Sequence, residues 1–241
     1  MKKAISNIFL GVTILIAGLG VLAYGAPPED SLREARQSMV ARQLQRRDIT
    51  DPRVLMAMGR VPRHRFVPQA LASQAYGDHP LPIGSGQTIS QPYIVALMTQ
   101  WAEVQPGAKV LEVGTGSGYQ AAVLAEMTDK VFTIELRPEL ARQAAARLKE
   151  LGYDRVRAKS GDGYQGWPEE TPFDAILVTA AAPRVPPALE AQLKNGGRLV
   201  IPLENSFGAQ NLVRFRKIQG KLVQETSLPV RFVPLVQPPA D

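Results

Sequence analysis

The chain has 241 residues, of which 45% are hydrophobic, so it can bury one full core and is expected to form a single domain with small additions. It contains no cysteine and only two histidines, which excludes disulfides, thiolate nucleophiles and metal sites built on cysteine or several histidines. The formal net charge of +6 is spread along the sequence rather than gathered in a stripe, which argues against nucleic-acid binding.

The first 26 residues form a leader that is expected to be separate from the fold. Lys2 and Lys3 precede an uncharged stretch over residues 4–26 that is mostly apolar and ends in alanine and glycine. This pattern is typical of a secretory signal, and its length also allows an uncleaved anchor that contacts the membrane. Five arginines follow before residue 48, a balance that would leave the folded part on the cytoplasmic side.

Three helices are expected next. The first begins at Ser31, because Ser31 and Glu34 have the spacing of a capping box. The second begins at the Asp-Pro pair 51–52, where a cap precedes a first-turn proline. A loop rich in Gly, Pro, Ser and Thr covers residues 77–91 and leads into a third helix with Pro92 in its first turn.

From residue 108 onward, strand-like and helix-like runs alternate. The strands are expected near 109–113, 131–135, 156–160, 174–179 and 198–202, and the helices near 119–127, 138–151 and 186–194. This alternation predicts parallel strands joined by right-handed crossovers. Two further runs, 212–217 and 222–228, flank Gly220 and predict an antiparallel pair.

The predicted fold is therefore of the α/β class. It consists of a doubly wound, mostly parallel sheet over residues 108–241 that carries a C-terminal antiparallel strand pair. An N-terminal helical cap with a loop for the substrate is expected over residues 27–107, and residues 27–241 are expected to form one domain.

The most informative motif is a strand that turns into a helix on Gly114, Gly116 and Gly118. Such a turn lets a ligand lie against bare backbone, because glycine has no Cβ. Glu135 ends the next strand, about 20 positions after the first of these glycines, where α/β nucleotide folds hold ribose hydroxyls. The two features together predict an adenosine-type ligand.

The glycine spacing indicates which adenosine ligand binds. A dinucleotide fingerprint needs its third glycine at the position of Tyr119, which disfavours a nicotinamide oxidoreductase. The compact spacing, preceded by Glu112, is instead typical of S-adenosylmethionine binding. Asp162 lies between Gly161 and Gly163 at the end of the third strand. We favour an interaction of its carboxylate with the adenine amino group, and a simple Asx turn is the alternative.

With these motifs assembled, the chain resembles the protein-L-isoaspartate O-methyltransferase family. The resemblance rests above all on residues 81–93 (LPIGSGQTISQPY). Further matching runs are 51–55, 61–63, 66–68, 111–120, 161–163, 178–183, 196–200 and 230–235, so the resemblance covers nearly everything after residue 35. The chain departs from the family at Ser160, where a histidine is common, and in its leader, since the family is usually cytoplasmic and unanchored.

The resemblance implies a Rossmann-like methyltransferase fold and a specific reaction. A methyl group passes from S-adenosylmethionine to the free carboxylate of L-isoaspartyl residues in damaged proteins and peptides, which starts their repair through a succinimide. A carboxylate with a pKa of about 4 is already ionised at neutral pH. The reaction therefore requires alignment of the reacting atoms and no metal, protein nucleophile or general base.

The resemblance also implies roles for individual residues. Ser90 is expected to orient the substrate carboxylate with Thr88 beside it, and the alternative for Ser90 is a helix cap next to Pro92. Cofactor contacts are expected from Glu112, Gly114, Gly116, Gly118, Glu135, Leu136, Asp162 and Gly163, with Glu135 on the ribose and Leu136 on the adenine. His64 is expected on an exposed loop and outside the catalytic site.

Two other functions remain open at this point. One is an S-adenosylmethionine-dependent methyltransferase that acts on a small molecule or RNA, and the other is a non-catalytic binder of damaged polypeptides. Because S-adenosylmethionine is made in the cytosol, we expect a cytoplasmic location with or without a membrane tether, and export to the periplasm is the alternative. The oligomeric state is open, with a monomer as the default.

Overall fold

The computed structural model describes residues 28–238. The leader over residues 1–26, and with it the membrane contact expected from residues 4–26, lies outside the described residues. Within the described part, no helix combines the length and the apolar character needed to cross a membrane.

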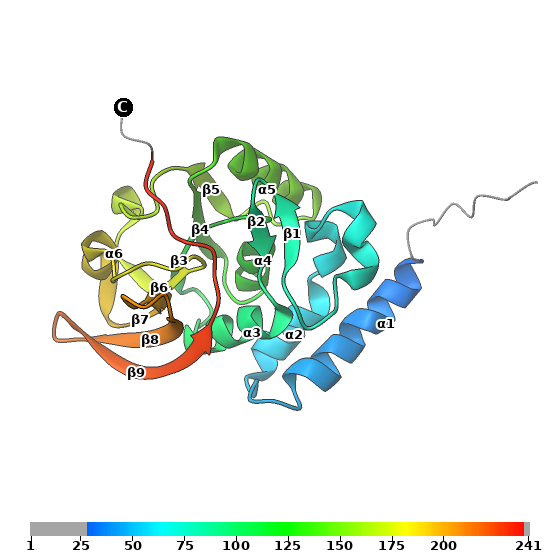
Figure 1. Ribbon diagram of the computed structural model, residues 1–241, viewed down its shortest axis with the longest axis horizontal. Coiled ribbons are helices and arrows are strands. Elements are labelled where there is room, and N and C mark those ends of the chain that lie inside the picture. The colour runs from blue at the N-terminus through cyan, green and yellow to red at the C-terminus, as the bar shows by residue number, and fades with distance from the viewer. Residues whose placement is uncertain (1–27, 239–241) are drawn as a thin grey trace, which may run out of the picture.

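Seven strands form one sheet in the order β5-β4-β3-β6-β7-β8-β9 (Figure 1). Their bounds are β3 Lys109–Val113, β4 Lys130–Glu135, β5 Arg157–Ser160, β6 Phe173–Val178, β7 Leu193–Glu204, β8 Gln210–Ile218 and β9 Lys221–Val230. The five strands β3 to β7 run parallel, whereas β8 and β9 are antiparallel to their neighbours. The predicted α/β fold with a C-terminal antiparallel pair is confirmed, and that pair extends the same sheet.

The sheet is wound in two directions from β3. The chain moves outward through α4 (Tyr119–Ala125), β4, α5 (Pro138–Glu150) and β5, and then returns to the other side of β3 as β6. A third helix, α6 (Pro187–Gln192), connects β6 to β7. Helices α4 and α5 pack on one face of the sheet and α6 packs on the other, as expected for right-handed crossovers that run in opposite directions. The strand order therefore reverses at β3, which is where open α/β sheets bind ligands.

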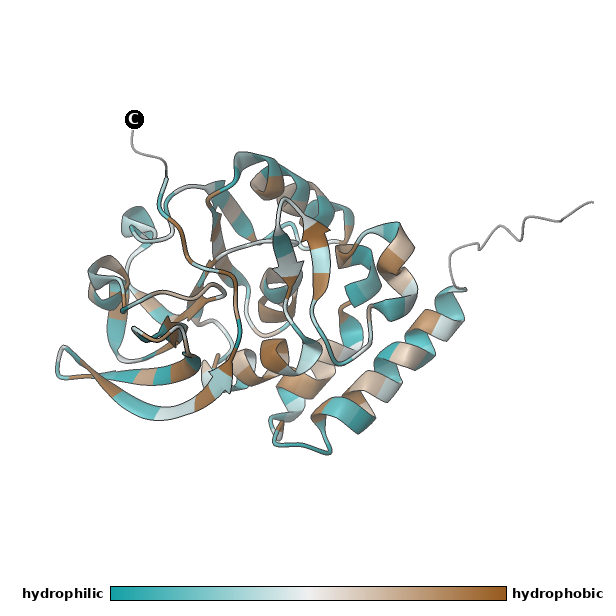
Figure 2. Cartoon of the chain, viewed as in Figure 1, coloured by the Kyte–Doolittle hydropathy of each residue, from teal (hydrophilic) through white to brown (hydrophobic). Residues whose placement is uncertain are grey.

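The N-terminal part is helical, as predicted. It comprises α1 (Glu29–Met39), the π-helical turn η1 (Val40–Leu44), α2 (Pro52–Arg60), the 3₁₀ turns η2 (Arg63–Phe66) and η3 (Gln69–Gln74), and α3 (Pro92–Trp101). These elements bury Met39, Met58 and Leu97 in one hydrophobic cluster with Val110 and Val131 of the sheet. Apolar residues alternate with polar ones along α1, as Figure 2 shows, which is the pattern of a helix that buries one face.

The opposite face of the sheet has its own hydrophobic cluster. Leu111, Phe132 and Phe173 of the sheet pack there with Trp167 and with Leu189 of α6. The Phe132 ring meets the rings of Trp167 and Phe173 edge to face, with centroids 5.4 and 5.8 Å apart. Each such pair contributes about 0.5–1.5 kcal/mol beyond its buried area. The sheet is thus held between two apolar layers, which fixes the positions of its strand ends.

Helix starts were predicted with mixed success. Helix α2 begins as expected, with Asp51 as the N-cap whose carboxylate accepts a hydrogen bond from the Arg53 N–H. Helix α1, however, begins at Glu29, so the capping box predicted at Ser31 is wrong. The Ser31 hydroxyl donates to the Pro28 carbonyl at 2.7 Å, one turn earlier, because the helix already includes Ser31.

The segment predicted as a loop over residues 77–91 contains a small hairpin. Strands β1 (Leu81–Gly84) and β2 (Gln87–Ile89) pair antiparallel. The turn between them needs left-handed backbone, with φ of +52° at Ser85 and +69° at Gly86. Glycine and proline signals therefore mark the turn correctly, but they hide the two short strands that it joins.

Candidate functional site

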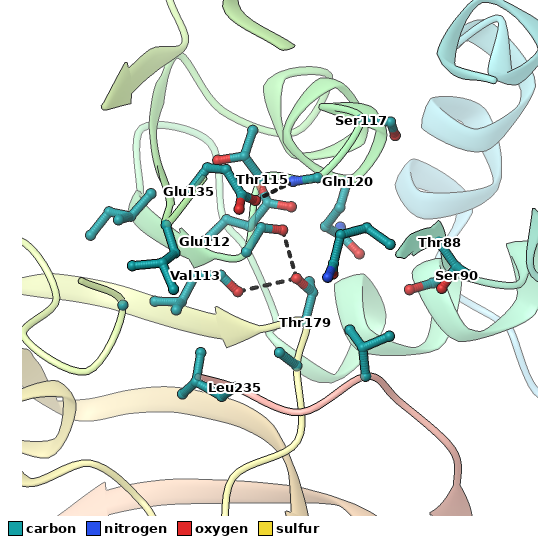
Figure 3. Close-up of a pocket in the computed structure, with 18 of the residues that line it drawn as sticks. Thr88, Ser90, Glu112, Val113, Thr115, Ser117, Gln120, Glu135, Thr179 and Leu235 are labelled. Atoms are coloured by element: carbon teal, nitrogen blue, oxygen red, sulfur yellow. Dashed lines mark hydrogen bonds between the residues drawn. The ribbon is translucent and has the colours of Figure 1, made fainter. Parts of the chain in front are cut away.

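A cleft opens at the carboxyl ends of β3, β4 and β6, beside the reversal of strand order (Figure 3). It holds about 820 Å³ of space, including the part open to solvent. Its walls come from β2 and the residue after it (87–90), from residues 112–117, 119 and 120, from the end of β4 and the turn after it (134–137), and from residues 233–236 of the C-terminal tail. All predicted site residues line this cleft except Gly118 and Asp162.

The glycine loop lies against the end of β6. Gly114 has a φ of +99°, and a Cβ added there would clash with the Thr179 hydroxyl oxygen. That hydroxyl donates to the Gly114 carbonyl at 2.7 Å and ties the loop to the strand end. Gly116 has a φ of +52°, but its added Cβ would meet only the Ile83 side chain, at 3.5 Å. Packing therefore requires glycine at position 114, whereas backbone conformation and the open cleft favour it at 116.

Glu112 is completely buried beneath the glycine loop. Its Oε2 accepts a hydrogen bond from the Thr133 hydroxyl at 2.6 Å, and the Thr115 hydroxyl lies 2.6 Å from Thr133. Its Oε1 has no hydrogen-bond partner among the described residues. Burial raises the pKa of Glu112 to about 8, the Thr133 hydrogen bond opposes this rise, and the charge of Glu135 adds to it. The cleft thus contains a buried acceptor that a cationic donor can satisfy.

Gln120 provides a second acceptor of this kind. Its amide nitrogen donates to the Thr99 hydroxyl at 2.9 Å, and its Oε1 is buried without a partner in the described part of the chain. Gln120 lies in the first turn of α4 and lines the cleft with Glu112 and Val95. No role was predicted for Gln120 from the sequence, because an acceptor without a partner becomes visible only when its neighbours are known.

Glu135 holds the loop from the other side. Its Oε2 accepts from the Gly116 N–H at 2.9 Å and its Oε1 accepts from the Arg137 N–H at 3.0 Å. Each carboxylate oxygen keeps a free lone pair, so Glu135 can also accept from a ribose hydroxyl. Glu135 is only 7% exposed as a residue, and it lines the cleft together with Leu136.

The hydroxyls of Thr88 and Ser90 lie across the cleft from Glu112 and Glu135 (Figure 3). They come from β2 and the residue that follows it, and neither makes a hydrogen bond to another described side chain or backbone group. The alternative role of Ser90 as a helix cap is wrong. Helix α3 begins at Pro92 with Gln91 as its N-cap, and no side chain caps it.

Two predicted cofactor residues lie outside the cleft. Gly118 is the N-cap of α4 with a φ of +90°, and a Cβ added there would press on Leu148 of α5 at 3.3 Å. The missing side chain of Gly118 therefore allows α4 to pack closely against α5. The Asp162 Oδ1 accepts from the Tyr164 N–H at 2.9 Å, which is the contact of an Asx turn, while the neighbouring Gly163 lines the cleft.

The C-terminal tail forms a wall that the sequence did not assign to the site. The Ala181 N–H donates to the Val233 carbonyl at 2.8 Å, and the Leu235 N–H donates to the Ala181 carbonyl at 2.7 Å. The Tyr164 hydroxyl donates to the Leu235 carbonyl at 3.1 Å. These bonds draw the tail across the strand ends, as Figure 1 shows. The sequence signal for this wall was that runs 178–183 and 230–235 both match the family. In the structure the second run binds along the first.

The prediction that His64 lies on an exposed loop is wrong. His64 is 7% exposed in η2, where its Nδ1 lies 2.7 Å from the Tyr76 hydroxyl and its Nε2 lies 3.3 Å from a Glu29 carboxylate oxygen. It packs the helical cap and does not line the cleft. Within residues 28–238, no cluster of three or more His, Asp or Glu side chains could hold a metal ion.

Comparisons with known proteins point to one family. The model of "Protein-L-isoaspartate(D-aspartate) O-methyltransferase" matches residues 34–239. The protein-L-isoaspartate O-methyltransferase of Opitutus terrae is 57% identical over 224 residues, covering 93% of this chain and 94% of its own. The enzyme of that name from Gloeobacter violaceus is 55% identical over 199 residues, covering 83% of this chain and 97% of its own.

A solved structure gives the same result. A Plasmodium falciparum crystal structure, described as a protein-L-isoaspartate O-methyltransferase in complex with S-adenosyl-L-homocysteine, is 30% identical with a TM-score of 0.73. The match covers 83% of this chain and 98% of that chain. With the family model spanning most of the sequence and the fold and cleft in agreement, the chain belongs to the protein-L-isoaspartate(D-aspartate) O-methyltransferase family.

Proposed function

We propose that this cleft aligns S-adenosylmethionine, bound along the glycine loop, with a substrate carboxylate held by Ser90 and Thr88. The family's reaction is methyl transfer from S-adenosylmethionine to the free carboxylate of L-isoaspartyl residues in damaged proteins, and the chain is an enzyme of this type. One observation carries our assignment of residues. The Thr88 and Ser90 hydroxyls, which bond to no described residue, and the loop with Glu135 come from distant parts of the sequence and line the same cleft.

The residues of the cleft fit the cofactor. The unpartnered oxygens of Glu112 and Gln120 are two buried acceptors, which suit the ammonium group of its methionine part. Glu135 suits the ribose hydroxyls, and Leu136 offers an apolar surface to the adenine. Gly116 leaves its side of the loop open for close approach. When bound, S-adenosylmethionine supplies an electrophilic methyl group on a positively charged sulfur.

The side chains on the hairpin act by orientation. The substrate carboxylate has an ordinary pKa of about 4, so it reaches the cleft ionised and no residue has to remove a proton. In our proposal the Ser90 hydroxyl donates to one carboxylate oxygen, with Thr88 beside it, and this leaves the other oxygen turned toward the methyl group. Alignment of this kind is worth about 7–11 kcal/mol of the barrier.

The replacement Ser90→Ala tests this role. We expect turnover to fall by about 100-fold, because the carboxylate loses its main orienting contact. The affinity for S-adenosylhomocysteine, measured by calorimetry, should stay unchanged, since the replacement leaves the glycine loop intact. Ser73→Ala is the matched control, because Ser73 is exposed on η3 and does not line the cleft. Normal turnover in the Ser90 variant contradicts the proposed role.

We further infer that the folded part of the chain works in the cytoplasm, with or without a tether, because S-adenosylmethionine is made there. Arginines after the leader support this orientation. A protease added to intact cells tests it. Protection of the folded part until lysis is expected, and its cleavage in intact cells would place it outside.

A further inference from the structure

A second cavity adjoins the cofactor cleft on the side of the two hydroxyls. It holds about 760 Å³, including the part open to solvent, and we call it the flanking groove. It shares Thr88, Ser90, Thr179 and Val233 with the cofactor cleft. From these residues it continues between the start of α3 and residues 229–233. A carboxylate held at Ser90 would therefore lie at the junction of the two spaces.

Among the described residues, the lining of the flanking groove contains a single charged one. Ile94, Pro229 and Phe232 give it an apolar wall, and none of its lining residues is acidic. Arg231 is the charged residue, and its side chain is exposed. By contrast, Arg214 on the neighbouring strand forms an ion pair with Glu225 at 2.6 Å. No carboxylate among the described residues lies within 4 Å of the Arg231 guanidinium.

The backbone around Arg231 is held on both sides. Val230 pairs with Gln210 in the sheet, and the Phe232 N–H donates to the Gln210 side chain at 2.7 Å. The Val233 carbonyl then accepts from Ala181 at 2.8 Å. Arg231 thus extends from a held backbone at the rim of the flanking groove, and its guanidinium has no carboxylate partner within the part of the chain that the structure describes. A cation that no described carboxylate neutralises can discriminate between ligands by charge.

We propose that the flanking groove takes the polypeptide on one side of the isoaspartyl residue, and that Arg231 selects substrates with an acidic side chain there. This inference rests on the proposed function, which places the substrate carboxylate at Ser90. One residue of extended chain covers about 3.3–3.6 Å, so a neighbouring residue lies next to the junction of the two cavities. The apolar wall accommodates the body of that residue, while Arg231 pairs with its carboxylate.

The expected effect is moderate because Arg231 is exposed. Ion pairs at exposed positions change an equilibrium by about 1.5-fold to 5-fold. The preference should shrink with salt, since the screening length falls from about 10 Å at 0.1 M to about 3 Å at 1 M ionic strength.

The test uses the full chain and matched isoaspartyl peptides that carry Glu, Gln or Lys immediately before or after the isoaspartyl residue. We expect kcat/KM at low salt to rank Glu above Gln above Lys at one of these positions. Arg231→Gln should abolish the ranking, and Arg231→Glu should reverse it in favour of Lys. Arg216→Gln is the control, because Arg216 is also exposed but faces another cavity near β7. It should keep the ranking.

A binding readout separates recognition from chemistry. Anisotropy of the fluorescent Glu peptide, measured with S-adenosylhomocysteine present, should show weaker binding to the Arg231 variants and unchanged binding to the Arg216 variant. If isoaspartyl peptides are methylated equally whatever their flanks, or if Arg231→Glu keeps the original ranking, the inference is overturned while the proposed function stands. If the unmodified enzyme methylates no isoaspartyl peptide, the proposed function itself fails.

Discussion

Glu112 allows a quantitative test of the cleft's electrostatics. Its pKa is about 8 in the folded chain against an ordinary value of 4.5, because the carboxyl group is fully buried. The folded state therefore binds the proton more tightly than the unfolded state does. The stability that this proton contributes is complete below pH 4.5 and is lost as the pH rises through 8. At about 1.4 kcal/mol for each pH unit of that interval, the loss amounts to about 5 kcal/mol.

The replacement Glu112→Gln removes the ionisation and keeps the shape. Without cofactor, we expect the variant to match the unmodified chain at pH 5 and to exceed its Tm by about 10–20 °C at pH 9, given about 2–4 °C for each kcal/mol in a chain of this size. Thermal unfolding followed by circular dichroism from pH 5 to 9 measures this difference. Glu34→Gln, at an exposed position of α1, should follow the unmodified chain throughout. Parallel profiles for the Glu112 variant and the unmodified chain would refute the argument.

Three further predictions concern the cofactor side of the cleft. Gly116→Ala should cost about 1–2 kcal/mol of stability, because φ is +52° there, and it should also weaken S-adenosylhomocysteine binding. Gly152→Ala is the control, because Gly152 has a φ of +81° and open space around it, and this variant should lose only stability. Calorimetry on both variants checks this, and normal binding by Gly116→Ala contradicts it. Asp162→Asn keeps the turn to Tyr164 but loses the charge, so a drop of about tenfold in cofactor affinity supports contact with the adenine, whereas unchanged affinity leaves only the turn. Finally, binding of S-adenosylmethionine at pH 7 should release up to about one proton, because an ammonium group next to Glu112 favours its ionised form. Calorimetry in two buffers measures the release, which should vanish in Glu112→Gln; equal release in both proteins would argue against this origin.

The fold was largely predictable because its signals are local. Parallel strands buried on both faces appear as short apolar runs, and the structure places β3 at Lys109–Val113, as expected. The hairpin of β1 and β2 was missed because its strands are only four and three residues long and flank a two-residue turn. Such strands form where tertiary contacts hold them, and a periodic pattern cannot develop over so few residues.

Site residues were predictable from the sequence where their residue type and spacing point to a single function. Glycines with positive φ and a carboxylate at a strand end mark the cofactor loop in the sequence itself. Gly118 shows the limit of this argument, because its missing side chain makes room for Leu148 of another helix. The unpartnered oxygen of Gln120 and the tail wall near Val233 depend on contacts between distant segments, which a single sequence does not display.

The most direct test of the account is methyl transfer from labelled S-adenosylmethionine to two peptides that differ only in an isoaspartyl or an aspartyl linkage. The full chain should place base-labile label on the isoaspartyl peptide and leave the aspartyl peptide unlabelled. Cofactor binding without label on either peptide would contradict the assigned substrate and leave the cofactor cleft standing. A failure to bind the cofactor would contradict the argument from the glycine loop and Glu135.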